Sequence, residues 1–114
     1  MKNISLILIS LFFVGCAGGN QTLRDAAASG NLSTVKKAIA SGADINSQDP
    51  KNGYTPLHLA VSNDHKEVVK YLIVKKAKVN ILNSRNQTAL DLSDSESTDN
   101  YLKKHGAKKG FDLK

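Results

Sequence analysis

The sequence predicts an all-α protein, organised as a solenoid of about three helix-turn-helix repeats. Two observations predict this fold class. The hexapeptide TPLHLA at 55–60 has a weaker copy, TALDLS, whose threonine Thr88 lies 33 residues after Thr55. The helix end GAD at 42–44 has its counterpart KAK 34 residues later, at 76–78. A unit of this length cannot bury its own apolar face and must stack on copies of itself.

Size and composition allow one small domain. The chain has 114 residues, of which 40% are hydrophobic, but only 5% are aromatic and Trp is absent. A core built from Leu, Ile, Val and Ala is therefore expected to be marginally stable. The formal net charge is +6. This excess is typical of a solvated lysine-rich face, and attraction to acidic partners or anionic membranes is the alternative.

Residues 1–15 are typical of a signal peptide. A positive start at Lys2 precedes an apolar run of 11 residues, Ile4 to Val14, which reads ISLILISLFFV. A helix needs about 20 apolar residues to span a bilayer, so this run is too short for a transmembrane segment. It has the length expected of the apolar region of an export signal.

The single cysteine, Cys16, follows this run. The residues Phe13-Val14-Gly15-Cys16 resemble the lipobox of bacterial lipoproteins, with Phe13 in place of the usual leucine. The resemblance implies cleavage before Cys16 and lipidation of Cys16, with palmitate-type acyl chains on its sulfur and its new amine. Two or three chains give stable anchoring. An ordinary cleaved signal followed by a chance cysteine is the alternative.

Residues 16–21 are therefore expected to be the lipidated cysteine and a short linker. The resemblance implies an exported chain, lipid-anchored to a bacterial membrane, at the periplasmic face of an outer membrane or at the cell surface. The five residues 17–21 span at most about 17 Å when extended. We therefore expect the domain to stay close to the bilayer and to meet a membrane-proximal partner.

The middle unit, residues 52–82, carries the clearest repeat pattern. Thr55 is a natural N-cap, and Pro56 suits the first helical position, where its missing N–H is not needed. A second helix is expected from about Lys66 to Lys75. Its buried stripe consists of Val68, Val69, Leu72 and Ile73.

This middle unit resembles the consensus of the ankyrin repeat family. Units at 22–48 and 84–107 resemble it more weakly. The ankyrin domain is therefore expected to cover residues 22–107, with residues 108–114 as a frayed tail. The resemblance implies a stack of antiparallel helix pairs, with turns that project at right angles.

Four residues depart from the family pattern. Asp64 and Lys76 stand where the family has glycine at a helix end, so a left-handed backbone is expected at both. In the last unit Ala89 replaces proline and Asp91 replaces histidine, and a few residues are missing between its two helices. This last unit is expected to act as a cap.

No group of residues predicts catalysis, so neither enzyme activity nor a cofactor is expected. The sequence has no GxSxG motif and no glycine-rich phosphate loop, and its one cysteine is assigned to the anchor. His58, His65 and His105 fall at separate places in the repeat pattern, and the resemblance implies that His58 bonds to the Thr55 hydroxyl. A metal site is the alternative, but no carboxylate pair joins these histidines at metal-ligand spacing.

The ankyrin resemblance implies a binding module for a protein partner, which meets the turn tips and the exposed ends of the first helices. The candidate binding residues are Lys51, Asn52, Tyr54, Ser84, Arg85 and Gln87 at the tips, and Ser62 and Asn63 at a helix exit. Tyr54 and Arg85 are residue types enriched at binding hot spots. Simple solvation of the loops is the alternative for each residue taken singly.

Two functions remain open from the sequence. The first is the binding of an envelope protein by a membrane-tethered domain. The second is a tethered inhibitor or immunity protein that masks a co-encoded enzyme or toxin. Export argues against nucleic-acid binding, and the lysines between residues 66 and 78 are expected to form a solvated helix face. No small-molecule substrate is expected.

Overall fold

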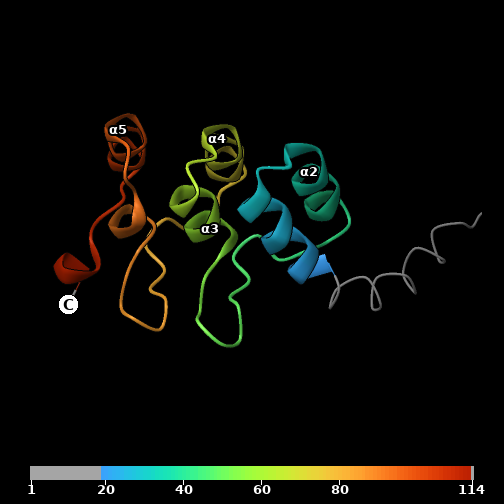
Figure 1. The fold of residues 1–114 in the computed structure, drawn as a ribbon, viewed down its shortest axis with the longest axis horizontal. Coiled ribbons are helices and arrows are strands. Elements are labelled where there is room, and N and C mark those ends of the chain that lie inside the picture. The colour runs from blue at the N-terminus through green and yellow to red at the C-terminus, as the bar shows by residue number, and fades with distance from the viewer. Residues whose placement is uncertain (1–18, 114) are drawn as a thin grey trace, which may run out of the picture.

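The computed structural model describes residues 19–113 and shows a stack of helix pairs (Figure 1). Regular structure in this part of the chain is entirely helical. The first helix covers residues 19–29 of the described chain. The following elements are α2 (Leu32–Ala40), α3 (Pro56–Ser62), α4 (Lys66–Val74), the 3-10 turn η1 (Leu90–Leu92), α5 (Glu96–Lys104) and the 3-10 turn η2 (Gly110–Leu113). The predicted all-α solenoid of about three repeats is confirmed.

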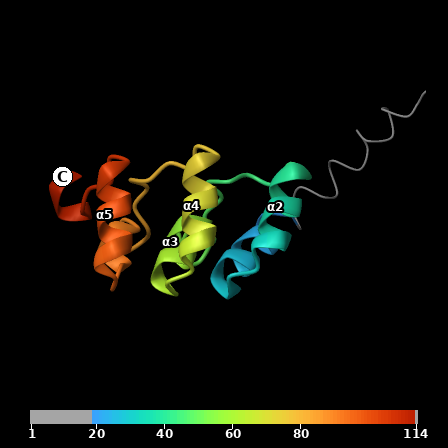
Figure 2. The same cartoon turned by 90° about the horizontal axis from the view of Figure 1, so that it is seen from above.

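The helices form two layers. The first helix, α3 and η1 make an inner layer, and α2, α4 and α5 make an outer layer (Figure 1). Seen from above, the three pairs follow one another in a row (Figure 2). The long loops after α2 and α4 project beyond the inner layer, as the family geometry implies. Within residues 19–113, no helix has the length and apolarity that a membrane span requires.

The start of α3 follows the predicted capping. The Thr55 hydroxyl accepts the His58 N–H at 3.2 Å, and the His58 Nδ1 accepts the Thr55 N–H at 3.1 Å. The predicted contact between this hydroxyl and the histidine ring is also present, with 2.8 Å between Oγ1 and Nδ1. Pro56 occupies the first turn, where its missing N–H leaves no helical bond unmade. Reciprocal capping of this kind satisfies two backbone donors at the helix start.

The apolar stripe predicted on the second helix of the middle repeat is buried in the core. Its members on α4 are Val68, Val69, Leu72 and Ile73. Together with Leu57 and Ala60 of α3 they belong to one cluster that extends through all three repeats. Because α4 lies between α2 and α5, its apolar face holds both neighbouring repeats in the stack.

Two helix ends place a side chain in a left-handed backbone, as predicted. Asp64 has a φ angle of 58° and Lys76 a φ angle of 73°. The positions equivalent to Lys76 in the flanking repeats are Gly42 and Gly106, with φ angles of 101° and 91°. A β-carbon in this region crowds the following carbonyl oxygen, which costs about 1–2 kcal/mol. The middle repeat therefore carries strain that its neighbours avoid.

Replacing Lys76 with glycine is expected to raise the free energy of unfolding by about 1 kcal/mol, because glycine adopts this φ without the steric cost. Equilibrium urea denaturation measures the change. The matched control is Lys75→Gly. Lys75 has a φ angle of −87°, so glycine there only adds freedom to the unfolded chain and should lower stability by about 0.5–1 kcal/mol. Changes of the same sign in both variants would contradict this account.

The third repeat is shorter than the other two. Its first helix is reduced to η1, in agreement with the residues missing from the sequence. Thr88 and Asp91 take the places of Thr55 and His58, because Asp91 Oδ2 accepts the Thr88 N–H at 2.9 Å. Helix α5 then begins after its N-cap, Ser95.

The segment 108–114 was predicted to be a frayed tail, but its first residues, up to Gly110, are held on the fold, whereas Phe111 to Leu113 are exposed. Gly110 is buried, and its N–H donates to Asp91 Oδ2 at 2.8 Å. The Thr88 hydroxyl donates to a carbonyl of the same segment at 2.7 Å. A β-carbon on Gly110 would collide with the Asn86 carbonyl oxygen, so this close approach requires glycine. Turn η2 therefore closes the C-terminal end of the stack.

The carboxylate that holds η2 has a lowered pKa. Burial acts to raise the pKa of Asp91, but hydrogen bonds from Thr88 and Gly110 and the positive charge of Lys109 favour the ionised form and outweigh it. Because the folded pKa lies below the unfolded one, the stabilising contribution is complete at neutral pH. It is lost only as the pH falls below about 3.8, through the folded value.

The first helix begins earlier than predicted. Residues 19–21, which the sequence assigned to a linker, are helical. The Asn20 Oδ1 accepts the Asp44 N–H at 2.8 Å, which ties the start of this helix to the loop after α2. From Cys16 to this helix the chain spans about 10 Å at most, less than the reach expected from the sequence. Cys16 and the predicted signal peptide lie outside the described residues.

Candidate binding surface

The two projecting turns are bonded internally and to each other. In the first turn, the Asp49 N–H donates to the Tyr54 carbonyl at 2.9 Å, and the Gly53 N–H donates to the Asp49 carbonyl at 2.8 Å. The second turn joins the first through the Ser84 N–H, which donates to the Asn52 carbonyl at 3.0 Å. The backbones of the two tips therefore hold fixed positions relative to one another.

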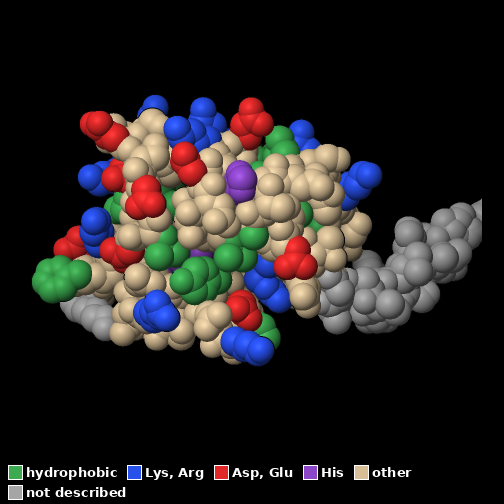
Figure 3. Space-filling model, viewed as in Figure 1, with side chains coloured by type: hydrophobic (Ala, Val, Ile, Leu, Met, Phe, Trp, Pro, Cys, Tyr) green, Lys and Arg blue, Asp and Glu red, His purple; other side chains and the backbone are tan. Residues whose placement is uncertain are grey.

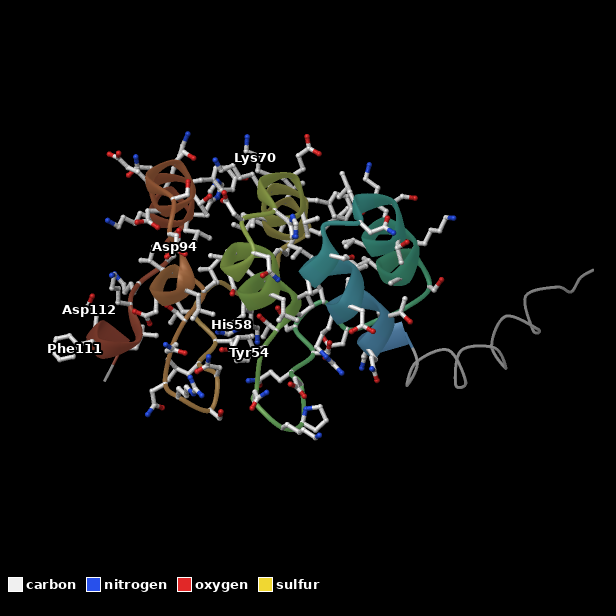
Figure 4. All side chains as sticks on the ribbon, in the orientation of Figure 1. Tyr54, His58, Lys70, Asp94, Phe111 and Asp112 are labelled. Atoms are coloured by element: carbon white, nitrogen blue, oxygen red, sulfur yellow. The ribbon has the colours of Figure 1, made fainter. Side chains whose placement is uncertain are left out.

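A hollow of about 200 Å³, here called the tip hollow, opens where the tips meet the inner layer. It is lined by Asp49, Asn52, Tyr54, Leu59 and Arg85. Tyr54 lies just below α3, next to His58 (Figure 4), and their ring centroids are 5.6 Å apart. Three of the predicted binding residues, Asn52, Tyr54 and Arg85, thus meet at one place.

A larger hollow of about 480 Å³ adjoins the tip hollow. Its lining includes Arg24 and Asp25 from the first helix and Lys51 from the first tip. Asp49 and Leu59 line both hollows, so the two form one continuous surface. Of these five residues, the sequence analysis named only Lys51. The sign in the sequence that could have identified the missed residues was the charged pair Arg24 and Asp25, next to buried positions of the first helix.

The other predicted binding residues lie outside the two hollows. Ser62 and Ser84 are exposed. The Asn63 Nδ2 donates to a carbonyl of the first helix at 3.1 Å, which ties α3 to its neighbour. The Gln87 Oε1 accepts from Asn83 Nδ2 at 3.0 Å. Asn63 and Gln87 therefore each use one side-chain atom within the fold, and their part in binding stays a prediction.

His58 is buried behind the tip hollow and links two repeats. Its Nδ1 accepts the Thr55 N–H, and its Nε2 lies 2.9 Å from the Gln87 carbonyl oxygen. A carbonyl only accepts and a backbone N–H only donates, so the ring is the neutral tautomer with its proton on Nε2. Burial lowers the pKa of His58 and outweighs the carbonyls and the carboxylate nearby, which act to raise it. This ring fixes the second tip against the first.

The three histidines occupy three separate places. His65 precedes α4, and its Nε2 donates to the Ala28 carbonyl at 3.0 Å, while His105 is exposed after α5. No group of three or more histidine, cysteine, aspartate or glutamate residues in the described chain is arranged to hold a metal ion. The two hollows offer hydrogen bonding, charge and one aromatic wall, Tyr54.

These features define a helical repeat protein: stacked helix pairs, a left-handed backbone at the helix ends, and projecting turns. Proteins of this class use extended surfaces to bind other molecules. Residues 23–110 match the family model described as "Ankyrin repeats (3 copies)". The chain belongs to the ankyrin repeat family, which is a protein-interaction fold. The resemblance predicted from the middle repeat is thereby confirmed over nearly the whole described chain.

Several curated proteins are similar to this chain over part of their length. Human ankyrin repeat domain-containing protein 40 is 40% identical over 73 residues, which are 64% of this chain and 20% of that protein. Protein phosphatase 1 regulatory subunit 27 of Mus musculus is 37% identical over 81 residues, which are 71% of this chain and 52% of that protein. NF-kappa-B inhibitor cactus of Drosophila yakuba is 30% identical over 63 residues, which are 55% of this chain and 13% of that protein. The match covers at most about half of these relatives, so the likeness concerns the repeats.

Proposed function

We propose that this chain is a membrane-tethered module that binds a protein partner at the tip hollow and the larger hollow beside it. One observation carries the proposal. Asn52, Tyr54 and Arg85 come from two different turns and meet in a single hollow whose walls are held by backbone bonds. A binding surface that is already ordered loses little conformational freedom when a partner arrives.

The two hollows suit a polypeptide segment that carries one apolar side chain with charged neighbours. The tip hollow, of about 200 Å³, is comparable to a cavity of about 150 Å³ that holds benzene. It therefore has room for one aromatic or branched side chain beside Tyr54 and Leu59. The larger hollow adds Arg24 and Asp25. Because charges of both signs lie on this surface, they favour one orientation of the bound partner and do not attract every charged molecule alike.

Tyr54→Ala and Arg85→Ala are each expected to weaken partner binding roughly 30-fold, about 2 kcal/mol, because tyrosine and arginine in preformed hollows dominate binding energies. A photoreactive amino acid at position 54 captures the partner in the native envelope, and titration of the purified partner then measures the affinity. Tyr71→Ala and Lys103→Ala are the controls, because both residues lie in the outer layer. They should bind within about twofold of the unchanged chain.

The result that would refute this surface is specific. A chain with the photoreactive amino acid at position 71 is the capture control. If the chain that carries it at position 54 captures nothing that this control does not also capture, the tips are not the binding site. The same conclusion follows if Tyr54→Ala, shown to be folded by circular dichroism, binds with unchanged affinity.

The membrane part of the proposal rests on Cys16 and the lipobox-like residues before it. The relatives described above are eukaryotic proteins, and their names do not mention a lipid anchor. A lipid on Cys16 would hold the domain within about 10 Å of its attachment point. Such tethering raises the effective concentration of the binding surface for partners in or near the same membrane.

Cys16→Ser is expected to abolish the incorporation of labelled palmitate, because serine lacks the sulfur that carries the diacylglycerol. Fluorescence of the labelled chain on a gel and the mass of the N-terminal peptide are the measurements, and the mature peptide should begin at Cys16. Ser10→Ala, within the apolar run, is the control and should label normally. Label that persists in Cys16→Ser, or a mature chain that begins elsewhere, would refute the anchor.

A tethered inhibitor is the second candidate function. Two relatives carry regulatory names, a protein phosphatase 1 regulatory subunit and an NF-kappa-B inhibitor. If this chain acts in that way, the activity of an enzyme or toxin captured at position 54 falls in proportion to the complex formed, and Tyr54→Ala restores it. A captured partner whose activity is unchanged in the complex would leave simple docking as the function.

A further inference from the structure

The lysines of the domain gather on the outer layer. The exposed lysines of the outer helices and their ends are Lys36, Lys37, Lys66, Lys70, Lys75, Lys76, Lys103 and Lys104. We call these eight residues the outer basic face. The acidic residues on the same helices are Glu67, Glu96 and Asp99, and Asp64 and Asp94 lie two residues before α4 and α5, which leaves a net charge of +3. The inner helices carry Arg24, Asp25 and Asp91, a net charge of −1. Basic side chains line the upper edge of Figure 3, with a few acidic ones between them.

One lysine–tyrosine contact occurs twice along this face. Lys36 of α2 lies over the Tyr71 ring of α4, 5.5 Å from its centroid, and Lys70 of α4 lies over the Tyr101 ring of α5 at 5.8 Å. The residues are equivalent: each lysine lies six residues, and each tyrosine five, before the left-handed residue that ends its helix pair. Contacts of this length are cation–π interactions. They keep the lysines of neighbouring helices in line, with half-buried tyrosines between them.

The outer basic face also has apolar elements. Between α4 and α5 it is hollowed by about 170 Å³, with Val69 and Tyr101 in the lining and Lys66 and Lys70 beside them. At the end of α4, Val74 is 67% exposed. Such a face suits the surface of a bilayer. The lysine ammonium groups meet the lipid headgroups, while the apolar lysine stems and the tyrosine rings lie at the level of the headgroups.

The predicted tether joins the first helix, which belongs to the inner layer and is tied to the loop after α2 (Figure 1). The Asn20 Oδ1 accepts the Asp44 N–H at 2.8 Å, just after the carboxyl end of α2. Only Ala17 and Gly18 lie between Cys16 and the first helix, a reach of about 10 Å. A chain held at Cys16 therefore brings the carboxyl end of α2 close to the bilayer, and the rest of the outer layer can reach the same surface by rotation about the tether.

We propose that the outer basic face lies against an anionic phospholipid surface, while the tip hollow faces away from the bilayer. The inference rests on the proposed membrane tether and adds an orientation to it. Charge complementarity favours the lipid, since α2 and α4 carry a net positive charge that the inner helices lack, while α5 is neutral because Glu96 and Asp99 offset Lys103 and Lys104. The outer layer and the projecting turns lie on opposite sides of the stack (Figure 1), so lipid contact leaves the binding surface open.

Amine labelling of the full-length chain on vesicles tests the orientation. The chain is reconstituted in phosphatidylcholine alone and in phosphatidylcholine mixed with phosphatidylglycerol, and the labelling of each lysine is read by mass spectrometry. Lys70 and Lys103 should react about fivefold more slowly on the anionic vesicles. Lys51, at a tip, should react equally on both. In about 1 M salt, where the screening length is about 3 Å, the difference should vanish.

Two variants with the same loss of charge separate the faces. Lys36→Gln combined with Lys75→Gln removes two charges from the outer basic face, and this double variant should lose most of the roughly fivefold protection of Lys70. Lys51→Gln with Arg85→Gln removes two charges from the tips and should leave the protection unchanged. Equal labelling on neutral and anionic vesicles would overturn the proposal. So would protection that appears only when an acidic protein is added, because the face would then bind protein.

The outcome is distinguishable from failure of the lipid anchor. Palmitate labelling of Cys16 tests the anchor and is blind to orientation. The lysine pattern reports orientation even if Cys16 is not acylated, because the full-length chain used in the reconstitution still carries its apolar run, Ile4 to Val14, as the attachment. Loss of the palmitate label with the lysine pattern retained would reject the anchor alone.

Discussion

Leu72→Ala is expected to lower the free energy of unfolding by about 3 kcal/mol. Leu72 is fully buried on α4, and truncating such a residue loses its transfer free energy and leaves a cavity that the surroundings fill only partly. The position matters as much as the residue. In a linear stack each repeat contacts only its neighbours, so weakening the middle unit separates the first repeat from the third.

Urea denaturation followed by circular dichroism measures the loss, and Val74→Ala is the matched control on the same helix. Val74 is 67% exposed, so its truncation should change stability by less than about 0.5 kcal/mol. For a three-repeat domain of ordinary stability, a loss of about 3 kcal/mol leaves a detectable unfolded fraction near physiological temperature. Similar losses in both variants would show that α4 is not packed as described.

His58→Ala is expected to cost about 2–3 kcal/mol. The substitution leaves the buried Thr55 N–H without its acceptor and removes the bond from Nε2 to the Gln87 carbonyl. The first loss weakens the start of α3, and the second loosens the link between the two tips. His105→Ala is the control, because His105 is exposed, and it should change stability by less than about 0.5 kcal/mol.

The same variant carries a pH signature. The folded pKa of His58 lies below its ordinary value of 6.5, so the unfolded chain takes up a proton first as the pH falls. The stability that depends on neutral His58 is therefore complete above about 6.5 and is lost as the pH falls from there through the folded value. His58→Ala should flatten this slope between about pH 7 and 5. A slope that matches that of the unchanged chain would contradict the assignment.

The elements of the middle repeat could be predicted because their determinants are local. The Thr55 cap, the position of Pro56 and the left-handed backbone at Asp64 and Lys76 depend on residues a few positions apart. The docked tail could not be predicted in this way. Its bond runs from Gly110 to Asp91, 19 positions back, and a repeat template has no place for it. The one sign in the sequence was the aspartate in place of histidine.

The candidate site was predictable in part. The turn tips follow from the repeat geometry, so Tyr54 and Arg85 could be named as binding residues before their positions were known. Their meeting in one hollow could not, since it depends on how the second turn bonds to the first. Arg24 and Asp25 were missed for the same reason, because a helix pattern shows which side is buried but not which loop lies beside the exposed side.

The sequence by itself determined the period of the repeat, the helix caps and the buried stripe, because each depends on side chains that are neighbours along one helix or turn. Only the tertiary structure decided how the two ends of the stack are finished and which surface residues lie together. Both depend on contacts between segments far apart in the chain. Such contacts arise when whole repeats dock, and their geometry is set by the sum of many small packing and hydrogen-bonding terms that no local pattern contains.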